Sequence, residues 1–113
     1  MRVDLAGNFP LSGDGRERVL QRTEQKLGRF GSVVQEATIT VDDVNGPKGG
    51  QDVRCLVRAR LSHMPDVVIE ERADSIGAAL HALDRAVHAI SRAIGKRQTI
   101  RRKAPNTTDL AWS

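Results

Sequence analysis

Hydrophobic and polar residues alternate along four short stretches of the chain, a pattern typical of strands with one buried face. The first stretch is 1–8, MRVDLAGN, with Val3 and Leu5 on the same side. The other three are 34–43 (VQEATITVDD), 52–61 (DVRCLVRARL) and 67–73 (VVIEERA). We therefore expect four strands, each apolar on one side only.

Two further segments repeat their apolar residues at intervals of three and four, which is the period of an amphipathic helix. The first helix is predicted from Arg16 to Phe30, with Gly31 as its C-terminal stop. The second is predicted from a cap at Asp74 or Ser75 to about Lys96 or Arg97. Its apolar stripe consists of Ile76, Leu80, Leu83, Val87, Ile90 and Ile94.

The order of these elements is β-α-β-β-β-α. Because each strand has a single apolar face, we expect an α+β domain in which one face of a four-stranded antiparallel sheet carries both helices. This domain is predicted to span residues 1–97. Residues 98–113 show no periodicity, so we expect them to form a basic, disordered C-terminal tail.

The amino-acid composition indicates which residues form the core and which cellular compartment suits the protein. The 113 residues include two Phe, one Trp and no Tyr, so the core of this single domain is expected to be aliphatic. The one cysteine, Cys55, excludes an internal disulfide and suits a reducing cytoplasm. The N-terminus lacks the apolar segment of a signal peptide, and no run approaches the length of a membrane span. We therefore expect a cytoplasmic protein.

The charge is basic and unevenly placed. Eighteen Lys and Arg against fourteen Asp and Glu give a net charge of +4, which suits a polyanion such as nucleic acid better than a membrane. Seven Lys or Arg and no acid lie between Arg85 and Lys103, and Arg97 continues the charge toward the tail. We define the basic strip as the cationic positions predicted on the outer sides of the two helices: Arg22, Lys26, Arg29, Arg85, His88, Arg92 and Lys96.

Ordinary structural roles could also explain these charged and aromatic residues. The polar side of a surface helix is normally charged, but it usually mixes signs, and the row on the second helix contains only bases. On the first helix Glu17 and Glu24 interrupt the row, so solvation and nucleic-acid contact are equally open there. Phe30 fits the core or a stacking platform equally well. A third basic row, Arg54, Arg58 and Arg60, has Glu36, Asp42 and Glu70 on neighbouring strands, which favours cross-strand ion pairs.

The glycine-rich segment NGPKGG, residues 45–50, raises the question of a phosphate-binding loop. A Walker-type loop needs a Ser or Thr after its Lys and lies between a strand and a helix. Here two glycines follow Lys48, and the segment joins two predicted strands. We interpret it as a hairpin turn with Lys48 at its tip, where it makes one phosphate contact or none.

The residues that could carry catalysis are few. Cys55 lies on the inward side of its strand and is expected to be a small buried hydrophobe. His63, His81 and His88 show no metal-ligand spacing with Cys55 or with one another. We therefore expect no enzyme activity, no metal, no cofactor and no small-molecule substrate.

The segment DDVNGPKGGQDVRC followed by VRARL, together with DSIGAALHALDRAVHAISRAIGK, resembles the bacterial ribosome hibernation factors, the ribosome-associated translation inhibitor family. The similarity covers roughly residues 1–97. It implies a fold like that of double-stranded-RNA-binding domains. It also implies binding to ribosomal RNA of the small subunit, in the channel of messenger and transfer RNA. Translation would then be inhibited in stressed or resting cells, and the free protein would be a monomer.

The resemblance also implies roles for individual residues. Lys26 and Arg29 match basic positions near the end of the family's first helix, and the row from Arg85 to Lys96 matches its second. His88 departs from the family, where Lys or Arg is usual, and its charge depends on pH. The alternative function, from another class, is a protein-interaction or regulatory module that uses the open sheet face with Leu56 and Val68.

Overall fold

The computed structural model describes the backbone of residues 1–44 and 52–111, and the side chains of residues 1–44 and 52–96. In chain order the elements are β1 (Arg2–Ala6), α1 (Gly13–Leu27), the short 3-10 helix η1 (Gly28–Phe30), β2 (Val34–Asp43), β3 (Val53–Leu61), β4 (Val67–Ala73), α2 (Ile76–Ala79) and α3 (His81–Ala111). The predicted order β-α-β-β-β-α is confirmed, with the second helix divided in two.

The four strands form one sheet in the order β1-β2-β3-β4. β3 is antiparallel to both of its neighbours, whereas β1 runs parallel to β2. The expected all-antiparallel sheet is therefore wrong at this edge. The reason is that the chain crosses over through α1 between β1 and β2, and it re-enters the sheet in the same direction.

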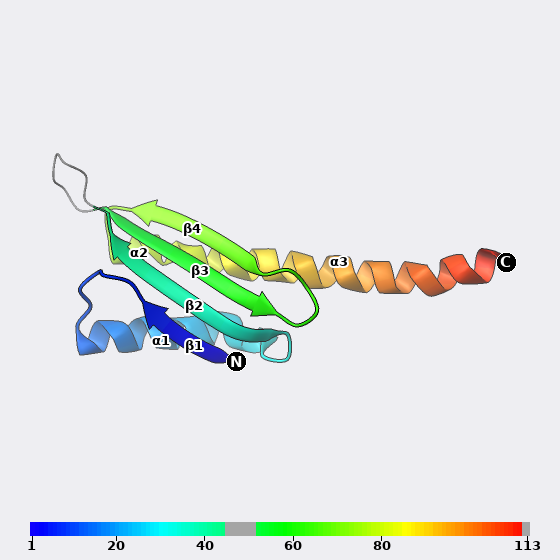
Figure 1. The fold of residues 1–113 in the computed structure, drawn as a ribbon, viewed down its shortest axis with the longest axis horizontal. Helices are drawn as coiled ribbons and strands as arrows, with labels where there is room; N and C mark the ends of the chain where they lie inside the picture. Colours follow the sequence, from blue (N-terminus) through cyan, green and yellow to red (C-terminus); the bar gives the residue numbers. More distant parts are fainter. Residues whose placement is uncertain (45–51, 112–113) are drawn as a thin grey trace.

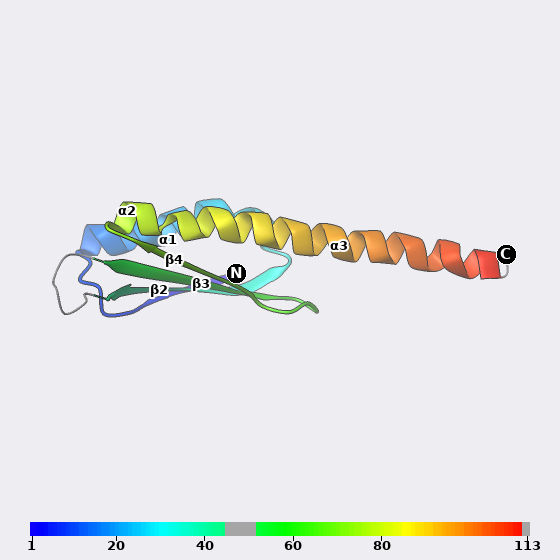
Figure 2. The same ribbon diagram turned by 90° about the horizontal axis from the view of Figure 1, so that it is seen from above.

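The domain has two layers, as predicted. All helices lie on one side of the sheet and leave its other side uncovered (Figures 1 and 2). We refer to this uncovered side as the open face. α1 and α3 lie side by side in the helical layer, with α1 over β1 and α3 over β3 and β4 (Figure 1).

Aliphatic side chains fill the space between the two layers, because alternate residues of every strand point toward the helices. The largest buried side chains include Leu27 from α1, Ile39 from β2, and Leu83 and Ile90 from α3. Thr23 is also buried, and its hydroxyl donates a hydrogen bond to the carbonyl of Val19 at 2.8 Å. Burying a side chain as large as Leu or Ile contributes about 1.5–3 kcal/mol, so this interface holds the domain together.

Both helical segments begin at a serine cap. The Ser12 hydroxyl accepts a hydrogen bond from the N–H of Gly15 at 3.0 Å, so α1 begins three residues before the predicted start. The Ser75 hydroxyl likewise accepts a hydrogen bond from the N–H of Ala78, and Ser75 is one of the two residues predicted to cap the second helix. Serine satisfies the free N–H groups of a first helical turn, which explains both starts.

The last helical segment differs from its prediction at two points. A break at Leu80 separates α2 from α3. In addition, α3 continues to Ala111, past the end predicted near Lys96, and extends well beyond the sheet (Figure 1). A helix forms its backbone hydrogen bonds internally, so it can extend past its last core contact. The division into a 1–97 domain and a tail stays a prediction.

None of the described helices is both long and apolar enough to cross a membrane.

The predicted inward position of Cys55 is confirmed: its side chain is fully buried in β3. Burial, helped by the nearby negative charge of Glu71, raises the pKa of the thiol from 9.0 to about 11. Thiolate is the reactive form of cysteine, so this position suits packing rather than nucleophilic chemistry.

This pKa shift predicts a pH dependence of stability. In the unfolded chain the thiol ionises near pH 9, whereas in the folded protein it holds its proton to about pH 11. The stabilisation is thus fully present below pH 9 and is lost as the pH rises to about 11; it amounts to at most about 3 kcal/mol. Urea unfolding of wild type and Cys55→Ala across this range measures it. If the two free energies of unfolding fall in parallel, the burial of the thiol is not what titrates.

Candidate functional site

The helical layer brings cationic side chains from distant parts of the sequence together. Lys26 of α1 and Asp84 of α3 form an ion pair, with 2.8 Å between Nζ and Oδ1, which joins the two helices. A groove of about 470 Å³ runs between them at this point. We call it the interhelix groove, and its lining residues are Gln25, Lys26, Arg29, Asp84, Val87 and His88. The structure thus places three members of the basic strip, from both helices, around one hollow.

The basic row on α3 continues from His88, which lines this groove, to Arg92 and Lys96. His88, Arg92 and Lys96 are exposed along α3, and no acidic side chain of the described residues pairs with them. Arg22 is half-buried on α1. Lys48 lies outside the described residues, and so does the side chain of Arg97. Within the described residues, the outer side of α3 therefore offers Arg92, Lys96 and the imidazole of His88 to a ligand.

Arg85 is exposed on α3, as its helical spacing predicts, but its side chain already has partners on the sheet. Its Nη1 donates to the carboxylate of Glu71 at 2.7 Å and to the backbone carbonyl of Glu70 at 2.9 Å. Both partners belong to β4, so Arg85 ties α3 to the sheet. Helical spacing predicted the exposed position but not these partners, because spacing does not show which strand lies beside the helix.

Asp84 is the site residue that the sequence analysis missed. The hydrogen bond from Lys26 lowers the pKa of its carboxyl group, and the positive charges of Lys26, Arg22 and His81 lower it further. The carboxylate is therefore ionised in the middle of a basic surface. Asp84 lies four residues before His88, so helical spacing could have indicated that it lies beside the basic row. It was missed because the acid-free run was counted from Arg85, one residue later.

Phe30 lies at the edge of the core, as one of the two interpretations of the sequence expected, and whether it stacks on a ligand stays a prediction. Its ring is partly buried against the core. The guanidinium carbon of Arg29 lies over this ring, 4.7 Å from the centroid, as a cation–π pair. The core residue thus supports a cation that lines the interhelix groove.

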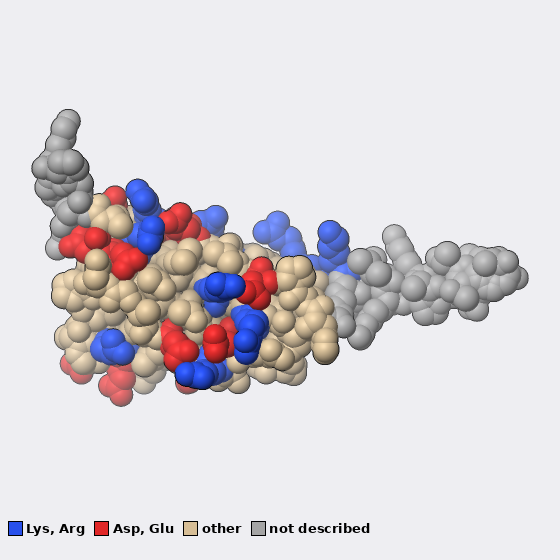
Figure 3. Space-filling view, in the orientation of Figure 1, with Lys and Arg blue, Asp and Glu red and all other residues tan. Residues whose placement is uncertain are grey.

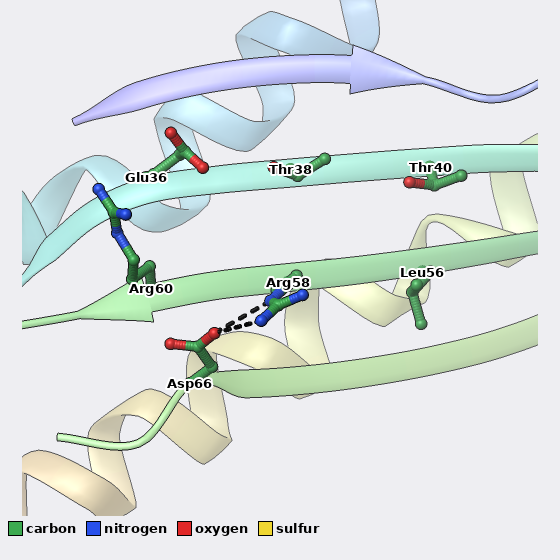
Figure 4. A pocket seen from close by; sticks show the side chains of 7 residues that line it. All are labelled: Glu36, Thr38, Thr40, Leu56, Arg58, Arg60 and Asp66. Carbon is green, nitrogen blue, oxygen red and sulfur yellow. Dashed lines mark hydrogen bonds and ion pairs between the residues drawn. The ribbon is translucent and has the colours of Figure 1, made fainter.

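The open face has a different electrostatic character. Arg54 contacts Asp42 at 3.1 Å and Glu70 at 3.6 Å, which confirms the expected cross-strand ion pairs for this residue. Arg58 pairs with Asp66 at 2.8 Å, and Arg60 lies opposite Glu36 in the register (Figure 4). On this side, Lys and Arg side chains lie next to Asp and Glu side chains at several places, with uncharged residues between these groups (Figure 3). Its cations are therefore largely neutralised by neighbours, and the face is poorly suited to a polyanion.

No group of three or more His, Cys, Asp or Glu side chains in the described part of the chain is arranged to hold a metal ion. The chemistry that the described site offers is electrostatic and hydrogen bonding: Lys26 and Arg29 line one side of the groove, and the imidazole of His88 and the carboxylate of Asp84 line the other.

The different positions of Arg85 and Arg92 generate a prediction for stability. Arg85→Glu removes the bonds to β4 and places a carboxylate beside Glu71, so we expect a loss of about 1 kcal/mol. Arg92→Glu carries the same charge change on the exposed side of the same helix and should stay within about 0.5 kcal/mol of wild type. Urea denaturation compares the two variants. Equal stabilities would show that Arg85 does not hold α3 to the sheet.

Solved structures of two proteins resemble this fold. The N-terminal domain of Thermus thermophilus Protein Y superimposes with a TM-score of 0.60 at 21% identity, covering 81% of this chain and 98% of that one. A ribosomal subunit interface protein from Coxiella burnetii gives a TM-score of 0.57 at 16% identity, covering 88% and 99%. No family model and no curated protein sequence matches the chain. The chain therefore has the fold of these two proteins, which confirms the α+β fold expected from its sequence.

Proposed function

We propose that this protein is a ribosome hibernation factor that binds ribosomal RNA of the small subunit through its helical layer. The observation that carries the proposal is the groove in which basic residues of α1 and α3 come together beside the unpaired row on α3. A surface of clustered cations is the electrostatic footprint of a phosphate-backbone partner. The sequence resemblance to hibernation factors and the shared fold of a ribosomal subunit interface protein support the same partner.

Translation would be inhibited because the bound protein occupies a channel that translation requires. A domain seated in the channel of the small subunit excludes messenger RNA and the transfer RNAs of the A and P sites from the same space, and it needs no covalent step. This agrees with a site made of cations rather than of a nucleophile and base. We accordingly assign the protein no enzymatic activity and no cofactor, and we place it in the cytoplasm of resting or stressed cells.

The proposal predicts which basic side chains contribute to binding of the small ribosomal subunit. Arg92→Glu should lower the affinity for purified small subunits several-fold and reduce the slope of log affinity against log salt by at least about one, because a phosphate contact is lost. Arg72→Glu is the matched control, since Arg72 is an exposed residue of β4, away from the helical layer. Co-sedimentation across a salt series measures both variants.

The same co-sedimentation experiment distinguishes the proposal from the alternative function, a protein-interaction module that uses the open face. If the protein acted through the open face, Arg72→Glu would weaken binding more than Arg92→Glu does. The wild-type affinity would also change little with salt, because apolar contacts through Leu56 and the exposed Val68 do not release counterions. That pattern would contradict the proposal.

A further inference from the structure

The interhelix groove contains more than an array of charges. The guanidinium of Arg29 is planar, and its central carbon lies over the Phe30 ring, 4.7 Å from the centroid, so the ring restricts where the guanidinium can move. Arg29 is itself exposed, and it lines the groove. Unpaired RNA bases stack on arginine planes as well as on aromatic rings, so a supported guanidinium is a platform for a base.

The carboxylate in the groove determines which part of RNA can lie there. Asp84 is ionised and accepts hydrogen bonds only. A phosphate beside it would meet a like charge, whereas base edges and ribose hydroxyls carry donors. The ion pair with Lys26 engages one carboxylate oxygen, Oδ1. The chemistry of the groove therefore suits a group that brings donors to Asp84 and an acceptor to Lys26.

We propose that the interhelix groove binds one unpaired guanine base of RNA. Guanine presents two parallel donors, N1–H and the N2 amine, which match the two oxygens of a carboxylate, and its O6 acceptor lies beside them. Asp84 accepts from the two donors, Lys26 donates to O6, and the Arg29 plane stacks on the ring. Neither adenine, cytosine nor uracil offers two adjacent parallel donors.

This inference rests on the proposed function and makes it specific. The phosphates on either side of the base would contact neighbouring residues of the strip, such as Arg92 and Lys96. The groove would then provide sequence preference, while the exposed row on α3 would provide affinity that does not depend on sequence.

Short single-stranded RNAs test the inference directly. The probe is a fluorescent oligouridine with one central guanosine, and the comparison probes carry inosine, which lacks the N2 amine, or uridine at the same position. We expect the wild-type protein to bind the guanosine probe about tenfold more tightly than the inosine probe, the size of one good bidentate contact. Equal affinities for the two probes, or no saturable binding of the guanosine probe, would overturn the inference.

Two variants assign the preference to its residues. Asp84→Asn should reduce the guanosine-to-inosine ratio to near one and strengthen binding of the uridine probe, because a negative charge leaves the strip. Glu24→Gln, at an exposed position on α1 outside the groove, makes the same charge change and should preserve the ratio. Arg29→Lys keeps the charge but loses the plane, and it should weaken the guanosine and inosine probes alike. An unchanged ratio in Asp84→Asn would remove Asp84 from base recognition.

These results are independent of the test of the proposed function. Small-subunit binding that is sensitive to Arg92→Glu, combined with no guanosine preference, would leave the hibernation proposal standing and reject the base site alone. A guanosine preference without small-subunit binding would reject the proposed partner but keep the groove as an RNA site.

Discussion

The structure depends on the burial of one side of a four-stranded sheet beneath two helices. The strands have one apolar face each, and with few aromatic residues the aliphatic side chains must form the whole core. Such a sheet is stable only when something covers that face. Leu27 of α1 and Leu83 and Ile90 of α3 cover it from above, while Ile39 is among the side chains that meet them from the sheet. This requirement forces α1 and α3 to lie side by side and turns their polar sides outward together.

The two outer surfaces of the molecule then differ in charge for a structural reason. On the open face, neighbouring strands lie close enough for residues such as Arg54 and Asp42 to pair, so the charges cancel locally. On the helical layer, basic residues recur along α1 and α3 and border a groove between them, where Asp84 is the one acid among the described lining residues. The helical layer is therefore the side better suited to a polyanion, and it carries the carboxylate of Asp84 in the groove between α1 and α3.

Periodicity predicted the elements because burial on one side imposes it directly. It identified all four strands, both helical regions and the inward position of Cys55. It did not predict the parallel pairing of β1, since a crossover depends on where the chain returns, nor the start of α1 at Ser12, which depends on a cap. The basic strip followed from helical spacing, but the engagement of Arg85 with β4 and of Asp84 with Lys26 depends on neighbours distant in sequence. Tertiary contacts of this kind are not visible in a single helix pattern.

The central claim is that the helical layer, and not the open face, contacts ribosomal RNA. A cryo-electron-microscopy reconstruction of small ribosomal subunits saturated with the protein tests it most directly, because it shows which layer faces the RNA. The account predicts density for the domain in the channel of messenger and transfer RNA, with α1 and α3 against RNA and the open face turned away from the phosphate backbone. Density with the open face against RNA, or a domain that contacts only ribosomal proteins outside the channel, would contradict it.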